Sequence, residues 1–464
     1  MKPQSNYPLY TLVPILLLAC SSTIAQRNVI AKVDEYVKAE MRRQKIPGVS
    51  LAIMKDGKAI LAKGYGFANV EHKVLVKPET VFQSGSVGKQ FTATAVMMLV
   101  EDGKIGLDEK ISKYLGEVPD SWKPVTIRQL LSHTGGFTDY PDDFDLRKDY
   151  TEDELLKRWQ TITLAFQPGE KWQYSNLGYV TLGILIHKVT GKFYGDFLDE
   201  RIFKPLGMKT ARIINEADIV PNRAAGYRLV NGELKNQQWV SPSLNTTADG
   251  SLYLTAQDMA KWDAALYGEN LLKGATLEQM WTPVTLKDGR THPYGFGWSL
   301  RTVNRHKLVE HGGSWQGFKA HIARYVDDKL TVIVFANLAQ TNQSRIAHQV
   351  AAIIQPELLQ RFAQDPEPQV TAQFKELLER LTEGKADTII FGSELQASLF
   401  EGNGRLFSFI KTLGPIQSFQ LLERSEKNGI RSYRYQVDYA AMTVYLDIEK
   451  DQKGKIIVFD VQPE

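Results

Sequence analysis

The first 360 residues begin and end with strand patterns and have mostly helical patterns between them. Val49–Met54 and Ala59–Phe67 flank a turn at Asp56-Gly57, which predicts a β-hairpin. Three later strand patterns cover residues 308–311, 318–325 and 330–337, and two apolar helices are predicted over 90–100 and 177–189, with stops at Gly103 and Gly191. Early and late strands together predict one antiparallel sheet with a helical region folded against it, an α+β fold.

A second, smaller unit is predicted after the proline-containing stretch Gln364–Gln369. An amphipathic helix is marked by Phe374, Leu377, Leu378 and Leu381, and strands are expected over 417–423, 430–439, 442–448 and 455–461. We therefore expect a main domain over 26–360, a linker over 361–370 and a C-terminal α+β domain over 371–464. The order of elements in that last domain is similar to cystatin-like or NTF2-like folds.

Composition excludes several classes of function. Lys and Arg total 56 against 53 Asp and Glu, so the net charge is only +3 and no basic excess indicates nucleic-acid binding. The single cysteine, Cys20, rules out an intrachain disulfide and a thiolate zinc cluster. The eight histidines show no HExxH spacing. We therefore expect no metal and no other cofactor. The expected partner is a small molecule or a peptide as the substrate.

The N-terminus has the pattern of a signal peptide over residues 1–25. Leu9–Ala19 is largely apolar but shorter than the roughly 20 residues that span a bilayer. Leu17–Cys20 resembles a bacterial lipobox, in which Cys20 becomes the lipid-carrying N-terminus and attaches the protein to the membrane. Thr23–Ala25 instead resembles a small-residue cleavage site, and a buried N-terminal helix is the third interpretation. We expect an exported protein that is periplasmic or membrane-anchored on the periplasmic side.

Ser86 and Lys89 stand where a glycine-containing turn enters the first apolar helix, so they share one helical face. A serine hydroxyl needs a base within hydrogen-bond reach to act as a nucleophile. A buried lysine supplies that base, because burial lowers the pKa of its amine. The alternative is a helix-capping serine followed by an exposed lysine.

Two further segments carry residues suited to the same chemistry. Tyr174 and Asn176 open the second apolar helix, where a tyrosine can relay a proton if a nearby cation lowers its pKa from about 10. His311-Gly312-Gly313 follows a strand pattern, where glycine permits close approach of a substrate backbone and the next N–H can bind an oxyanion. Taken singly, such residues are more often a packed aromatic, a helix cap and a bulge or turn.

The order Ser-x-x-Lys, Tyr-x-Asn, His-x-Gly resembles the serine β-lactamase-like superfamily. This superfamily includes penicillin-binding DD-peptidases, AmpC-type β-lactamases, D-aminopeptidases and related esterases. The resemblance covers about residues 33–354 and extends to five flanking motifs at Ile46–Ser50, Leu130–Gly135, Phe166–Glu170, Tyr174–Tyr179 and Gly250–Ala256. It implies an antiparallel sheet flanked by helices, an all-helical lobe and an active site at the seam between them.

The resemblance also implies a role for each matching residue. Ser86 would be acylated, Lys89 would accept its proton, and Tyr174 would carry a proton to the leaving group and then activate water. Asn176 would position the lysine and the substrate. The N–H groups of Ser86 and Ser314, the residue after Gly313, would form the oxyanion hole.

His311 and Gly312 depart from the Lys-Thr-Gly motif that is usual in β-lactamases. A substrate carboxylate would meet a smaller, pH-dependent charge at His311. This favours a serine hydrolase that acts on an amide or ester, such as a D-amino-acid peptide or a carboxylic ester. The alternatives are a class-C-like β-lactamase and a penicillin-binding-type sensor or binding protein with little turnover.

Overall fold

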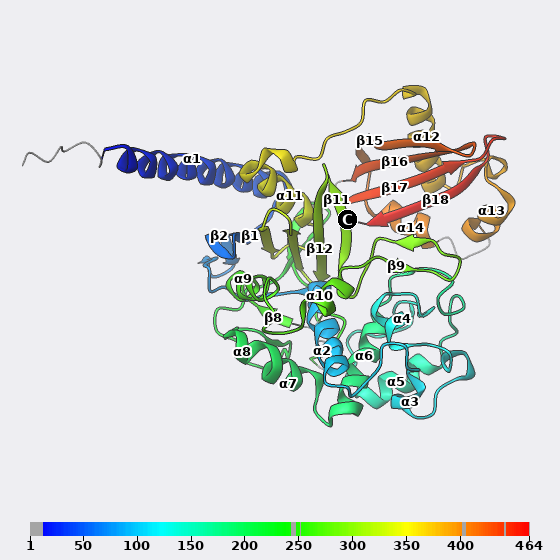
Figure 1. Ribbon diagram of the computed structural model, residues 1–464, viewed down its shortest axis with the longest axis horizontal. Coiled ribbons are helices and arrows are strands. Elements are labelled where there is room, and N and C mark those ends of the chain that lie inside the picture. The colour runs from blue at the N-terminus through cyan, green and yellow to red at the C-terminus, as the bar shows by residue number, and fades with distance from the viewer. Residues whose placement is uncertain (1–12, 243–246, 251, 401–404, 440–441, 464) are drawn as a thin grey trace, which may run out of the picture.

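The computed structural model describes residues 13–242, 247–250, 252–400, 405–439 and 442–463 (Figure 1). The α-helices are α1 (Val13–Gln44), α2 (Lys89–Glu101), α3 (Ser112–Leu115), α4 (Ile127–Leu131), α5 (Glu152–Gln160), α6 (Asn176–Thr190), α7 (Tyr194–Leu198), α8 (Lys204–Leu206), α9 (Ala256–Ala265), α10 (Gly274–Met280), α11 (Gln343–Ile354), α12 (Pro368–Thr382), α13 (Ser393–Phe400) and α14 (Arg405–Thr412). Short 3-10 or π turns are η1 (Gly85–Gly88), η2 (Asp120–Trp122), η3 (Asp199–Phe203), η5 (Pro356–Leu358) and η6 (Thr388–Ile390).

The early hairpin and the late strands form one antiparallel sheet, as predicted. Its order is β11-β12-β13-β14-β1-β2-β3. The strands are β1 (Gly48–Lys55), β2 (Lys58–Asn69), β3 (Val74–Leu75), β11 (Ser299–Val303), β12 (His306–Trp315), β13 (Phe318–Tyr325) and β14 (Leu330–Ala336). The smaller strands are β4 (Phe82–Gln83), β5 (Arg212–Ile213), β6 (Tyr227–Val230), β7 (Glu233–Asn236), β8 (Leu252–Leu254), β9 (Val284–Thr285) and β10 (Thr291–His292).

Alternation along the strands divides the core into two layers. Leu51 and Ile53 of β1 pack with α1 and α11 on one face, whereas Ala52 and Met54 belong to the cluster that holds α2, α6 and α9 on the other. Strand geometry explains this division, because successive side chains point to opposite faces of a sheet. The helical lobe therefore covers only one face of the sheet, as Figure 1 shows.

The two apolar helices are confirmed. Every residue of α2 from Lys89 to Leu99 is buried, and α6 is buried from Leu177 to Ile186. Gly191 ends α6 with φ of +69°, a left-handed conformation that glycine adopts without a Cβ penalty. Both helices start at the seam between the sheet and the helical lobe, so the residues at their N-termini lie there.

The C-terminal domain has the predicted order of helices followed by a meander. Strands β15 (Ile416–Lys427), β16 (Ile430–Tyr439), β17 (Thr443–Lys450) and β18 (Ile456–Pro463) form a sheet in chain order. The four apolar residues predicted to face the core from α12 are all buried in its cluster. Helix α12 begins at Pro368, within the stretch expected to be linker, because proline suits the first turn of a helix. Figure 1 shows this domain beside β11.

The N-terminal segment enters the structure as helix α1. Val33, Val37 and Met41 on its C-terminal part are buried under the sheet. The predicted cleavage sites fall on its N-terminal part, where the side chain of Cys20 lies outside the described residues, as do residues 1–12. Within the described ranges, no helix has the length and apolarity needed to cross a membrane.

Candidate active site

Ser86 lies on the turn η1, which leads directly into α2. Gly85 in this turn has φ of +51°, and a Cβ built on it would lie 2.5 Å from the backbone nitrogen of Ser314. A Cβ on Gly88 would lie 2.9 Å from Gly250. Glycine is therefore required at both positions, because only glycine allows this approach of the turn to β12 and to the loop before β8.

The amine of Lys89 is the centre of the site. Its Nζ lies 3.1 Å from the Ser86 hydroxyl, 2.6 Å from the side-chain oxygen of Asn176 and 2.6 Å from the backbone oxygen of Asp249. A neutral amine has two N–H groups and one lone pair. The two carbonyl oxygens can only accept, so the lone pair of the neutral amine must face the serine hydroxyl. The site therefore orients Lys89 as a base towards Ser86.

Burial also tunes this lysine. Its side chain is fully buried, and this burial lowers its pKa from 10.5 to about 8, although the charges of Asp249 and Asp139 act in the opposite direction. A measurable fraction of the amine is then neutral near pH 7. That fraction is what proton abstraction from Ser86 requires.

Tyr174 lies beside the same two groups. Its ring centroid is 4.8 Å from Lys89 Nζ, and its side chain hydrogen-bonds Ser86. The sequence analysis made a proton relay by this phenol conditional on a nearby cation lowering its pKa, and that condition is not met. Burial raises the pKa of Tyr174 well above 10, because the charged phenolate loses its solvent. Tyr174 is therefore a protonated phenol that can donate.

Asn176 links the lysine to the mouth of the site. Its amide nitrogen donates to both carboxylate oxygens of Asp139, at 3.0 and 3.2 Å, while its oxygen accepts from Lys89. These contacts fix the orientation of the amide. Asp139 is exposed, and its negative charge raises the pKa of Lys89.

His311 lies on β12 and faces the helical lobe. Its Nε2 is 2.9 Å from the Tyr294 hydroxyl and its Nδ1 is 2.6 Å from the backbone oxygen of Gly312. Nδ1 must donate to that carbonyl, so Nε2 accepts from Tyr294. The pH-dependent charge expected at this position is not found. Burial, followed by the charge of Lys89, lowers the pKa of His311 to about 3, so the imidazole is neutral at neutral pH.

A second histidine completes this chain of hydrogen bonds. His133 Nε2 is 3.2 Å from the Tyr294 hydroxyl, and its Nδ1 accepts from the backbone N–H of Ser175 at 3.1 Å. Its ring lies 4.3 Å from that of Tyr174, and its φ is +59°. His133 therefore connects the segment that carries Tyr174 and Asn176, through Tyr294, to His311 on β12, the catalytic strand.

The sequence analysis missed His133, Tyr294 and Asp249 as members of the site. His133 stands in the flanking motif Leu130–Gly135, and that motif was the available signal. Asp249 accepts from Lys89 through its backbone oxygen, and because every residue has such an oxygen, the residue type gives no signal for this role. Tyr294 precedes the glycine-rich stretch before β11, and only the fold brings it to His311.

Gly313 and Ser314 lie on β12 against the nucleophile turn. A Cβ on Gly313 would lie 2.0 Å from the backbone oxygen of Ser84 and 3.1 Å from the backbone nitrogen of Ser86. The backbone nitrogens of Ser86 and Ser314 thus belong to two segments in direct contact. Such a pair of N–H groups suits an oxyanion hole.

One His/Glu cluster among the described residues has a spacing that could hold a metal ion. It consists of Glu310, His321 and His348, whose ligand atoms lie within 4.8 Å of one another. The Glu310 carboxylate already accepts from both imidazoles, at 3.0 and 2.6 Å, and from Arg301 at 3.0 Å. The cluster is therefore satisfied as an ion-pair network, and it faces α11 rather than Ser86.

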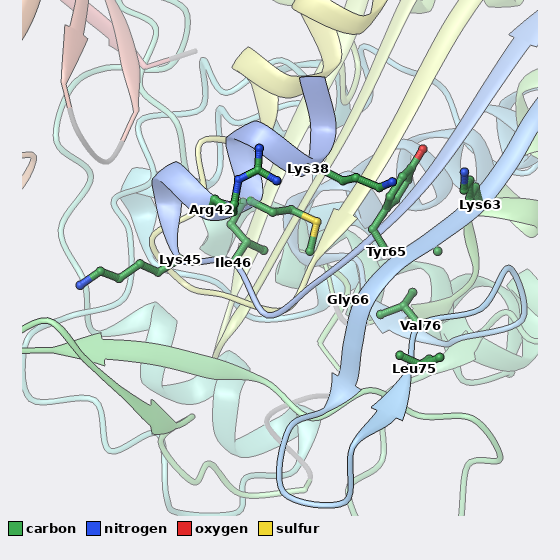
Figure 2. A pocket seen from close by; sticks show the side chains of 11 residues that line it. Lys38, Arg42, Lys45, Ile46, Lys63, Tyr65, Gly66, Leu75 and Val76 are labelled. Carbon is green, nitrogen blue, oxygen red and sulfur yellow. The ribbon is translucent and has the colours of Figure 1, made fainter. Parts of the chain in front are cut away.

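A hollow of about 670 Å³ lies elsewhere, between the C-terminal part of α1 and strands β2 and β3 (Figure 2). Figure 2 shows Lys38 and Arg42 of α1 and Lys45, which directly follows the helix, around the hollow, with Tyr65 on β2. It contains none of the active-site residues described above. The reactive groups lie instead at the seam of sheet and helical lobe.

Comparison with known proteins agrees with this geometry. Residues 33–355 match the family model described as Beta-lactamase. Penicillin-binding protein 4* of Bacillus subtilis is 31% identical over 61% of this chain and 66% of its own length, so the chain spans just under two thirds of that relative. A D-aminopeptidase of Gluconobacter oxydans is 28% identical over 76% of this chain and 67% of its own.

A solved structure extends the likeness of fold beyond that domain. The octameric penicillin-binding protein homologue from Pyrococcus abyssi has a TM-score of 0.62 and 24% identity, covering 94% of this chain and 98% of its own. The fold assignment therefore includes most of the C-terminal domain. Since the family model covers well over half of the chain, this protein belongs to the β-lactamase family.

Proposed function

We propose that the protein is a serine hydrolase that forms an acyl-enzyme at Ser86 from an amide or ester, with D-amino-acid peptides as the preferred class. One observation carries this proposal. Lys89 Nζ is 3.1 Å from the Ser86 hydroxyl, while two carbonyl oxygens hold its other hydrogens. This arrangement activates a nucleophile and serves no need of folding, because it buries an amine at the cost of its solvation.

The residues support a two-step mechanism. Neutral Lys89 takes the Ser86 proton as the oxygen attacks the substrate carbonyl, and the N–H groups of Ser86 and Ser314 bind the oxygen that becomes negative. Tyr174, a protonated phenol, passes its proton to the leaving group and takes up the proton that Lys89 received, so both Tyr174 and Lys89 return to their starting states. In the second step the same groups direct water to the acyl carbon, and Ser86 regains its proton.

The substrate class is supported by the position of His311 and Gly312. A neutral imidazole and a glycine offer a carboxylate neither the charge nor the hydroxyl of a Lys-Thr-Gly motif. This disfavours a class-C-like β-lactamase. The relative named D-aminopeptidase is consistent with a peptide substrate. Rapid nitrocefin hydrolysis that Ser86→Ala abolishes would instead support the β-lactamase alternative.

Labelling tests the mechanism directly. The folded protein is treated with a fluorophosphonate probe, digested and analysed by mass spectrometry, with Ser86→Ala as the control. We expect the label on Ser86 and none in the variant. Absence of label on Ser86 in the folded protein would contradict the proposal. An adduct that forms but releases no product over hours would favour the sensor alternative.

We also propose that the protein is exported and processed near residue 20 or 25. The apolar stretch Leu9–Ala19 and the lipobox-like Leu17–Cys20 support this. Mass spectrometry of the mature N-terminus in a bacterial host distinguishes a diacylated Cys20 from cleavage after Ala25. An unprocessed N-terminus on cytoplasmic protein would contradict export.

A further inference from the structure

A cavity of about 70 Å³ lies where the C-terminal domain meets the catalytic strand. Its walls include His311 and Gly312 of β12 and, from the C-terminal sheet, Arg434 and Tyr445. His292 of β10 also lines the cavity. The C-terminal domain therefore contributes side chains at the two residues immediately before Gly313.

The catalytic strand has an open edge at this point. Strand β11 pairs with β12 only as far as Ser299 opposite Glu310, whereas β13 pairs with β12 up to Trp315. From His311 onward, one edge of β12 has no strand partner among the described residues. Such an edge can bind an extended peptide by β-augmentation.

The direction of a bound peptide follows from the strand. A peptide that lies antiparallel to β12, with its scissile carbonyl at the N–H of Ser314, runs from Ser314 towards Gly312. Its leaving-group end therefore approaches Ser299 and the cavity. At about 3.4 Å per residue, a carboxylate one residue beyond the scissile bond lies level with Gly313, next to the cavity wall at Gly312.

The cavity has the size and charge for such a group. About 70 Å³ corresponds to roughly two waters, enough for a carboxylate but not for a further residue. Two guanidinium groups and the Glu310 carboxylate line it. Arg301 offsets that carboxylate, because it donates to Glu310 at 3.0 Å, and it stacks 4.1 Å over Tyr445, which leaves Arg434 as the second positive charge. Arg434 pairs with Asp447 at 3.5 Å, longer than a close charge-assisted hydrogen bond.

We propose that Arg434 binds the carboxylate of a leaving group one amino acid long. The C-terminal domain then takes over carboxylate recognition, which neutral His311 and Gly312 cannot provide. This inference rests on the proposed function. As the Ser86 oxygen bonds to the carbonyl carbon, the amide C–N bond breaks, and the leaving nitrogen takes the proton that Ser86 gave up. The carboxylate of the free amino acid stays bound to Arg434 until this product dissociates.

Binding tests this inference without catalysis. In the Ser86→Ala variant, calorimetry compares D-alanyl-D-alanine with D-alanyl-D-alanine amide, which lacks only the terminal charge. We expect the acid to bind about 10- to 100-fold more tightly, and Arg434→Gln to remove that difference. Arg431→Gln is the matched control, because Arg431 lies on the same strand with similar exposure and pairs with Glu367 at 3.8 Å. Equal affinity for acid and amide would overturn the inference.

Kinetics separate this inference from the proposed function. In the otherwise native enzyme, Arg434→Gln should raise KM for the acid about 10- to 100-fold and leave KM and kcat for the amide unchanged. Arg434→Lys should restore part of the loss. A parallel loss for both substrates, or no loss, would overturn the role of Arg434 while Ser86 acylation stands. Binding that discriminates acid from amide without any acylation would overturn the proposed function alone.

Discussion

Glu310 and His311 are consecutive buried residues of β12 that face opposite sides of the sheet. Glu310 keeps its charge, because Arg301, His321 and His348 hold the pKa of its carboxyl well below the usual value despite burial. Burial and the charge of Lys89 lower the pKa of His311 to about 3, so His311 is neutral. The same burial thus produces opposite charge states, depending on the partners each face provides.

The two faces of β12 thus differ in role: one contributes to stability and the other to catalysis. The face towards α11 holds a satisfied carboxylate, which stabilises the sheet. The face towards the helical lobe meets one amine with a lowered pKa and one protonated phenol, which both hydrogen-bond Ser86, and carries one neutral imidazole, which hydrogen-bonds Tyr294. We therefore expect substitutions on the lobe side to change rates and those on the α11 side to change stability.

The largest effect should come from Lys89→Ala. Loss of the base is expected to lower kcat by about 10²- to 10⁴-fold, measured with a chromogenic ester or D-amino-acid anilide. Lys104→Ala, at an exposed lysine beyond the end of α2, should leave kcat unchanged. A rate for Lys89→Ala within about threefold of wild type would contradict the assignment of the base.

Glu310→Gln should act on stability instead. Replacing the carboxylate weakens its hydrogen bonds to Arg301 and both imidazoles, so the free energy of unfolding should fall by about 1.5 to 3 kcal/mol. Urea unfolding measures this change, and kcat of the folded fraction should stay within about threefold. A large fall in kcat at unchanged stability would show that the two faces are not separate in function.

Tyr294→Phe should have an intermediate effect on rate. The substitution removes the hydroxyl between His133 and His311 and leaves the Nε2 of His311 without its donor. We expect kcat/KM to fall about 10-fold, the loss of one hydrogen bond in the buried site. Tyr267→Phe, at a half-exposed tyrosine, serves as the control. An unchanged kcat/KM would show that the chain of hydrogen bonds does not position His311 for catalysis.

The pH profile should report Lys89. Because the neutral amine is the active form and its pKa is about 8, kcat/KM should rise with pH and level off above that value. A plateau that extends below pH 6 would show that the amine is not the titrating base.

The smallest effect is expected for Asp139→Asn. Asp139 raises the pKa of Lys89 through its charge, so removing that charge should move the rise in kcat/KM to lower pH, by less than about one unit. The asparagine retains an oxygen that can accept from Asn176. A shift to higher pH would contradict the sign of this interaction.

Much of the fold could be predicted from local patterns. The hairpin at Asp56-Gly57, the stop of α6 at Gly191 and the apolar stripe of α12 depend on interactions within a few residues. The structure extends β12 through Trp315, where only a strand to His311 was expected, because β13 pairs with the additional residues. Although only Gln316-Gly317 separates the two strands, Gly312-Gly313 lack the β-branched or aromatic residues that mark a strand in a sequence.

The sequence by itself determined which residue types were available: a serine and a lysine one helical turn apart, a Tyr-x-Asn segment and a glycine-rich strand. Only the tertiary structure decided their states. Lys89 faces Ser86 because Asn176 and the Asp249 backbone occupy its other hydrogens, and His311 is neutral because it is buried near that amine. Hydrogen-bond direction and desolvation depend on groups more than 80 residues away in the chain, so no local pattern contains them.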